Sequence, residues 1–289
     1  MRSRNPVFSR EGSFTRDDQY AGFGTQTATQ PAGSAYGSPY AGSPYGGQQP
    51  PLTDDQLAAM YGAPSAGPAR TDRMTMDDVV ARTAMTLLTL VAFGALAWFT
   101  MPVDNFGPAI GAALIAMVIG LVVSFKRSVN PGLILAYAAL EGFFLGAISM
   151  ALETFLPGIA IQAVLGTSAV FAATLIAYKS GRIRVTPRYT RIGLTIAMGF
   201  VLLMLVNMVA MMFGADFGLR SGPLGIVVGL IGIALGAFFL TLDYAEIEEG
   251  IRRGAPEKEA WRAAFGLTLS LVWIYLEMLR LIAILRGDD

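Results

Sequence analysis

The chain has 289 residues, of which 21 are basic and 21 are acidic, so its formal net charge is zero. Charged residues make up 15% and hydrophobic residues 54% of the chain, whereas soluble domains usually carry about 25% charged residues, so the chain lacks the polar surface of a soluble globule. It contains no cysteine and no histidine, which excludes disulfides, thiol nucleophiles, and Ser-His or His-zinc sites, and its zero net charge argues against a nucleic-acid partner.

Residues 1–73 are predicted to be a disordered, low-complexity cytoplasmic tail. Gly, Ser, Pro, Gln and Tyr dominate this segment, and Leu52 and Leu57 are its only leucines. Such a composition buries too little apolar surface to offset the entropy that is lost on ordering. Residues 74–289 are predicted to form a separate membrane domain.

Seven apolar runs follow the tail, each about as long as the ~20-residue helix that crosses a bilayer. Backbone groups in lipid must be satisfied internally, so we expect helices and an all-α integral membrane fold. Polar punctuation separates the runs, as at Asn130-Pro131 and Thr186-Pro187. The predicted spans are 80–101, 107–125, 131–152, 158–178, 192–213, 222–243 and 263–285.

The basic residues predict the orientation of these spans. With seven spans, 18 of the 21 Lys and Arg residues fall on the side of the N-terminus. Arg220 and Arg286 fall on the opposite side, and Arg280 lies within the last span. The positive-inside rule therefore predicts a cytoplasmic N-terminus and an outside C-terminus. The expected location is the cell (plasma or inner) membrane, with the lipid bilayer as a partner.

Four pairs of glycines at four-residue spacing predict where helices pack closely. The pairs are Gly107/Gly111, Gly142/Gly146, Gly225/Gly229 and Gly232/Gly236. Small residues at this spacing let helix backbones approach each other in membranes. Ordinary bundle packing explains them, and a sixth helix that slides or rotates is the functional alternative.

Few ionisable residues lie within the spans, and these are the candidate functional residues. Glu141 lies in span three, Asp243 at the inner end of span six, and Glu277 and Arg280 in span seven. A charge at bilayer depth costs roughly 2.5–3.5 kcal/mol even on lenient insertion scales, so such residues usually face the interior and serve a function.

Glu277 has two possible roles. Arg280 follows it by three residues on the same helix face, so the two can form an ion pair that makes insertion tolerable. Alternatively, Glu277 meets another carboxylate across the bundle, and such a dyad either shares a proton or offers oxygens to a hard cation such as Ca²⁺. Glu141 has no charged partner on its own helix, so it is either proton-bound and water-lined or a neutral acid hydrogen-bonded between helices.

The segments LILAYAALEGFFLGAISM, KSGRIRVTPRYTR, FFLTLDYAEIEEG and AFGLTLSLVWIYLEMLRLIAILRGDD resemble the Bax-inhibitor family (transmembrane Bax-inhibitor-motif proteins), in particular its bacterial YccA-like branch. The resemblance covers about residues 74–289. It implies seven helices with the last one central, and a pH-sensitive Ca²⁺ leak gated by two acids on spans six and seven. Carried over, these acids are Asp243 and Glu277, which makes them the implied Ca²⁺ ligands, with no other cofactor.

Two departures from the family pattern bear on that dyad. The second acid is Glu277 and not an aspartate, and 34 residues separate it from Asp243. If straight helices turn near Gly254, the two acids are not level. Either the segment EIEEGIRRGAPEKEAW folds as a kinked interfacial element, or Glu277 pairs with Arg280 alone. The mixed charges of that segment predict a self-neutralising surface turn, or else a cap over the pore.

Three classes of function remain. The preferred one is a pH-sensitive cation leak channel or transporter, with Ca²⁺ as the expected ion, that uses Asp243, Glu277 and Glu141 to bind protons or cations. The second is a non-transporting regulator of another membrane protein, because bacterial relatives are linked to the membrane-anchored ATP-dependent protease. An enzyme is not expected, since the spans hold no nucleophile motif or metal box and Asp243 is the only candidate for an intramembrane aspartyl pair.

Overall fold

The computed structural model describes residues 72–102, 105–126, 128–214, 219 and 221–287. Residues 1–71, most of the predicted tail, lie outside the described part. The described residues form the helices α2 (Met76–Thr100), α3 (Gly107–Phe125), α4 (Pro131–Phe155), α5 (Ile159–Lys179), α6 (Pro187–Met212), α7 (Gly222–Arg252) and α8 (Glu259–Gly287). All seven are long and apolar enough to cross a membrane, which confirms the predicted count and the all-α fold class.

Local sequence signals explain where the helices begin. Thr75 caps α2, because its side chain accepts from the Asp78 amide while the Asp78 carboxylate accepts from the Thr75 amide. Asn130 caps α4 and Thr186 caps α6, and each cap is followed by a proline at the first helical position. The chain turns back between α7 and α8 at Gly254, whose φ of +67° suits glycine.

Five helices (α2, α4, α6, α7 and α8) extend at least three residues beyond the apolar runs that predicted them, among them the following three. α6 begins at Pro187 and not at 192, α7 continues to Arg252 and not to 243, and α8 begins at Glu259 and not at 263. Hydropathy marks the length that lipid can cover, whereas a helix continues into the headgroup region wherever its polar residues are good helix formers. The segment after Asp243 is therefore part of α7 and not a kinked element of its own.

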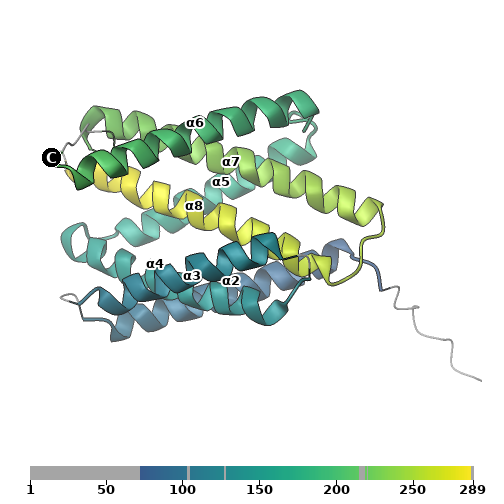
Figure 1. The fold of residues 1–289 in the computed structure, drawn as a ribbon, viewed down its shortest axis with the longest axis horizontal. Helices are drawn as coiled ribbons and strands as arrows, with labels where there is room; N and C mark the ends of the chain where they lie inside the picture. The colour runs from purple at the N-terminus through teal and green to yellow at the C-terminus, as the bar shows by residue number, and fades with distance from the viewer. Residues whose placement is uncertain (1–71, 103–104, 127, 215–218, 220, 288–289) are drawn as a thin grey trace, which may run out of the picture. The chain divides into compact units, whose positions relative to one another are not determined.

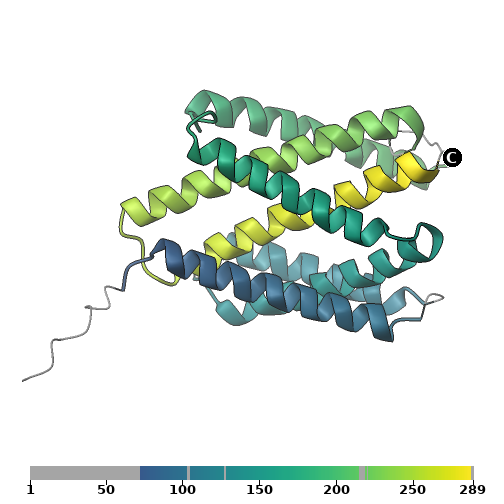
Figure 2. The ribbon, with the colours of Figure 1, turned by 180° about the vertical axis from the view of Figure 1, so that it is seen from behind.

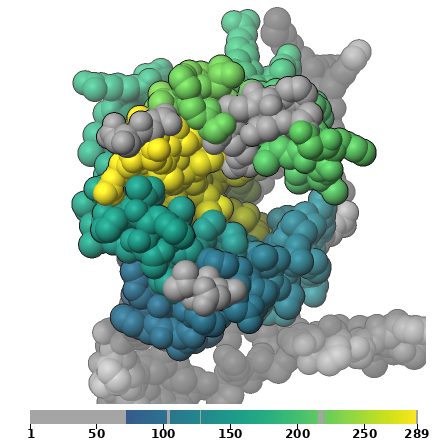
Figure 3. Space-filling model, turned by 90° about the vertical axis from the view of Figure 1, so that its left-hand side faces the viewer, coloured from purple at the N-terminus to yellow at the C-terminus, as the bar shows by residue number. Residues whose placement is uncertain are grey.

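α8 lies at the centre of the bundle, as the family resemblance implies. Figures 1 and 2 show it (yellow) crossing between a layer of α2, α3 and α4 and a layer of α5, α6 and α7. Its backbone packs closely on α2, α4, α5 and α7. It reaches α3 through a hydrogen bond from Arg262 to the Lys126 carbonyl, and α6 through a ring contact of Trp273 with Phe200. Figure 3 shows the end of α8 enclosed by these helices.

The helices alternate in direction, so the bundle has two ends. At one end, which we call the N side, the helices α2, α4, α6 and α8 begin and α3, α5 and α7 end. We call the opposite end the C side. Contacts at the N side join Met74 to Ala255 and Tyr178 to Glu248. At the C side Arg286 donates to the Pro157 carbonyl.

Two of the glycine pairs form close helix contacts as predicted. A Cβ on Gly142 or Gly146 would lie 2.1 Å from the carbonyl oxygen of Leu90 or Gly94, so α4 packs directly on the α2 backbone. Gly232 and Gly236, one turn apart, face α8, where a Cβ would meet the side chains of Glu277 and Ile274. The pair Gly107/Gly111 does not pack closely: a Cβ on Gly111 would meet nothing within 4 Å, because that face of α3 points away from the other helices.

Candidate functional site

Asp243 lies on α7 where this helix packs against α8. Its Oδ2 accepts a 2.6 Å hydrogen bond from the Ser270 hydroxyl of α8. Gly266 is one turn before Ser270, and a Cβ at Gly266 would come within 3.1 Å of Asp243 Oδ1. A serine donor and a glycine gap on α8 therefore fix the position of this carboxylate.

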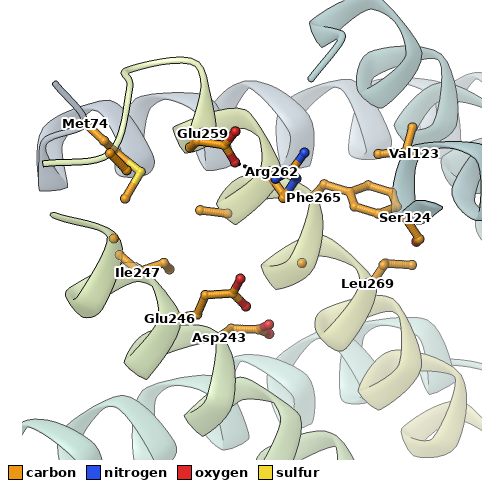
Figure 4. Close-up of a pocket in the computed structure, with 14 residues that line it drawn as sticks. Met74, Val123, Ser124, Asp243, Glu246, Ile247, Glu259, Arg262, Phe265 and Leu269 are labelled. Atoms are coloured by element: carbon orange, nitrogen blue, oxygen red, sulfur yellow. Dashed lines mark ion pairs between the residues drawn. The ribbon is translucent and has the colours of Figure 1, made fainter. Parts of the chain in front are cut away.

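Asp243 borders a cavity of about 350 Å³ near the N side, which we call the vestibule. Figure 4 shows Asp243 and Glu246 projecting into it from α7, with Glu259 and Arg262 on α8 and Val123 and Ser124 on α3. Glu259 and Arg262 form an ion pair of 2.8 Å. The charged lining thus consists of three carboxylates and one guanidinium, which makes the vestibule attractive to cations.

Residues 72–74, which we call the strap, close one side of the vestibule. The Met74 amide donates to the Ala255 carbonyl at 2.7 Å, and the Glu257 amide donates to the Asp72 carbonyl at 3.0 Å, so the strap forms a short antiparallel bridge with the α7–α8 connection. The Met74 side chain is 4% exposed and packs on Gly250. Residues 72 and 73, which the sequence assigns to the tail, pair with the α7–α8 connection in the structure.

Arg82 joins α2 to the α7–α8 connection through ion pairs. Its guanidinium bonds Asp78 at 3.1 Å one turn earlier on α2 and also pairs with Glu257 of the α7–α8 connection. Arg252 and Arg253 both pair with Glu249. The charged connection is therefore largely self-neutralising, as one of the two sequence interpretations expected.

Glu277 and Arg280 form an ion pair on α8. Glu277 Oε1 accepts from Arg280 Nη1 at 3.1 Å, and the other two atoms of the pair are also in contact. The side chains are only 8% and 14% exposed. Both pack against the glycine face of α7, with Glu277 beside Gly232 and Arg280 beside Gly229. Two glycines thus make room for a buried charged pair that larger side chains would displace.

The structure does not bring Asp243 and Glu277 together. Asp243 is level with Ser270, and Glu277 follows Ser270 by seven residues, which is about 10 Å along a helix. Ile274 lies between them, fully buried against Gly236. No group of three or more acidic side chains in the described residues is arranged to hold a metal ion. In this conformation α7 and α8 therefore meet in a register that separates the two acids, and Ca²⁺ binding by them stays a prediction.

Glu141 lies half-buried on the face of α4 that meets α8. Tyr137, one turn earlier, packs edge-on against Phe265 with ring centroids 5.1 Å apart, and Ser149, two turns later, bonds the Tyr275 hydroxyl at 2.7 Å. Glu141 is therefore close to the depth of Asp243, about one turn beyond Phe265. It is not among the residues that line the vestibule.

The sequence reasoning missed the hydroxyl residues of α8. Ser270 bonds Asp243, and Thr268 bonds Thr86 of α2 at 3.1 Å. The run LTLSLV holds both residues, and hydroxyls in an apolar span signal interhelical hydrogen bonds. No comparable sequence signal predicts the strap, because its hydrogen bonds are formed by backbone groups, which every residue other than proline has in full.

Comparison with known sequences agrees with this architecture. The profile of the family described as Bax inhibitor 1 like matches residues 5–287. The chain belongs to the Bax inhibitor 1 like family. The match covers nearly the whole chain, so this member is a multi-pass membrane protein whose helices contact the lipid bilayer. A search of curated proteins finds no match to it.

Proposed function

We propose that this Bax inhibitor 1 like protein is a pH-sensitive cation leak channel or transporter, with Ca²⁺ as the expected ion. The observation that supports this most is the Asp243 carboxylate at the wall of a vestibule that also holds Glu246 and Glu259. Carboxylate oxygens suit hard cations, and protonation of Asp243 would remove the charge that attracts them. This makes Asp243 both the cation contact and the proton sensor.

The path beyond the vestibule is closed in this conformation. Ile274 fills the space between α7 and α8 just past Asp243, and the Glu277–Arg280 pair follows toward the C side. Conduction therefore needs α7 and α8 to shift, and the glycine face of α7 offers little side-chain resistance to such a shift. In this proposal Glu277 forms a charged barrier with Arg280 and is not a partner of Asp243. Glu141 is a second proton site at the depth of Asp243.

The proposed orientation places the vestibule on the cytoplasmic side. Of the 14 basic residues that the structure describes, 12 lie at the N side, and an excess of Lys and Arg marks cytoplasmic ends. The strap would then cover the cytoplasmic mouth. As in the sequence prediction, no enzymatic role is proposed.

Flux through reconstituted protein tests the proposal. Liposomes loaded with a Ca²⁺ dye should show a leak that changes with pH, and Asp243→Asn should reduce the leak at least severalfold and flatten its pH profile. Glu248→Gln is the matched control, because Glu248 is an acid of the same helix that bonds Tyr178 outside the vestibule. The proposal fails if wild-type protein gives no flux, or if both variants change the profile equally.

A regulator that binds another membrane protein is the second candidate. A groove of about 740 Å³ between α2 and α5 favours this function. Residues of α4 and α8 form the bottom of the groove, and almost all of its lining side chains are apolar. Small residues such as Gly94 and Ala160 line it, so a transmembrane helix could approach closely. If deletion changes the activity of a membrane-anchored protease while the purified protein passes no ions, this function replaces the first.

A further inference from the structure

The connection between α5 and α6, together with the helix ends that flank it, carries five basic side chains at the N side of the bundle. They are Lys179, Arg182, Arg184, Arg188 and Arg191. All five are exposed, and the sequence from 179 to 214 holds no acidic residue. We call these five side chains the basic patch.

The basic patch differs from the other charged connection on the same side. In the α7–α8 region, Arg252, Arg253 and Arg262 each pair with an acid of their own helix or connection. By contrast, the basic patch takes part in no ion pair with any residue that the structure describes. Its positive charge is therefore available to a partner outside the protein.

The backbone presents this charge in an ordered turn at headgroup depth. Ser180, Gly181 and Ile183 donate backbone hydrogen bonds to carbonyls at the end of α5. The N-terminus of α6 lies within the patch, and the positive end of its helix dipole adds positive potential. Tyr178 and Tyr189 flank the connection, and tyrosines are typical of the membrane interface. The turn lies between two membrane-spanning helices, so its nearest neighbours are lipid headgroups.

We propose that the basic patch binds the phosphate groups of anionic phospholipids and so holds the N-side end of α6. This helix needs outside support, because among the described helices its backbone packs closely on α7 alone. Only Ala197, Phe200 and Asn207 of its 26 residues are buried. A cluster of at least four basic residues next to a membrane helix attracts anionic lipid. The lipid therefore acts as an additional packing partner for α6.

Site-specific quenching tests this proposal in the cysteine-free chain. Ser180→Cys carries a fluorophore in the patch, and Pro256→Cys carries it in the α7–α8 connection as a reference. Each protein is reconstituted in phosphatidylcholine with a trace of spin-labelled phosphatidylglycerol or spin-labelled phosphatidylcholine. We define the quenching ratio as quenching by the anionic lipid divided by quenching by the neutral lipid. We expect a ratio of about two or more at Ser180→Cys, because a few local positive charges enrich anionic lipid. At Pro256→Cys we expect a ratio near one.

A matched pair of charge variants separates binding from general attraction. Arg182→Gln/Arg184→Gln should bring the quenching ratio at Ser180→Cys close to one. Arg252→Gln/Arg253→Gln removes the same number of exposed charges from the self-paired connection and should leave that ratio unchanged. Equal ratios at the two wild-type sites, or an equal fall in both charge variants, would overturn the proposal. Quenching needs no ion flux, so this outcome is independent of the proposed leak.

Discussion

Glu277 and Arg280 are oppositely charged side chains held where water is nearly excluded. Removing one partner of such a pair leaves the other charge buried, which typically costs about 3–5 kcal/mol, whereas replacing both by neutral groups often costs little. The interaction is therefore measured by the free energy of unfolding that is lost when one partner is removed. The intact pair need not make the protein more stable than two neutral side chains would.

We expect Glu277→Gln and Arg280→Met each to lower the free energy of unfolding by about 3–5 kcal/mol, and the double variant to cost less than either alone. Unfolding of the purified protein in detergent, followed by circular dichroism, measures all three. Arg252→Gln is the control: it breaks an exposed pair with Glu249 and should cost no more than about 1 kcal/mol. Costs that simply add in the double variant would show that the two charges do not interact.

At the element scale, glycine spacing predicted close packing at four pairs but not which pairs form it or which helix each pair meets. Gly146 meets the Gly94 carbonyl, whereas Gly111 faces open space although its sequence context looks the same. Gly146→Ala should destabilise the bundle by about 1–3 kcal/mol, because the new methyl group overlaps the α2 backbone. Gly111→Ala should be neutral or slightly stabilising, since alanine favours the helix. Thermal unfolding of the two variants side by side decides this, and equal melting temperatures would contradict the packing.

The strap makes a second prediction at this scale. Ala263 lines the vestibule, so Ala263→Cys reports access to it through its rate of labelling by a charged thiol reagent. Met74→Ser should raise that rate several-fold, because the buried Met74 side chain covers the cavity. Met76→Ser is the matched control, since Met76 is already 51% exposed and lies outside the lining. A strap without a covering role would leave the rate the same in both variants.

How far the sequence predicts this protein depends on the kind of contact. The seven spans, the Glu277–Arg280 pair and the self-paired charges of the α7–α8 connection follow from composition and helix spacing, which are local. The relation of Asp243 to Ser270 depends on the register between two helices, and the sequence contains no local signal for register. The strap is held by backbone hydrogen bonds, so no side-chain pattern predicts it.

At the scale of the whole molecule, the charge distribution predicts how the bundle lies in the membrane. Ser180 lies in the α5–α6 connection on the basic N side, and Asn105 lies between α2 and α3 on the opposite side. A membrane-impermeant maleimide should therefore label Asn105→Cys in intact cells, and Ser180→Cys only after the cells are opened. Labelling of Ser180→Cys in intact cells would reverse the orientation and place the vestibule outside.

The strap also has a consequence for how the protein is assembled. Met74 and Ala255 are hydrogen-bonded, yet 181 positions separate them in the chain. During synthesis the first of these residues leaves the ribosome long before the second, and chains fold from the N-terminus onward. The apolar Met74 side chain therefore lacks its partner while the six helices α2 to α7 are inserted. A nascent chain that stops short of residue 255 has no closed vestibule, so the cover is among the last parts of the protein to form.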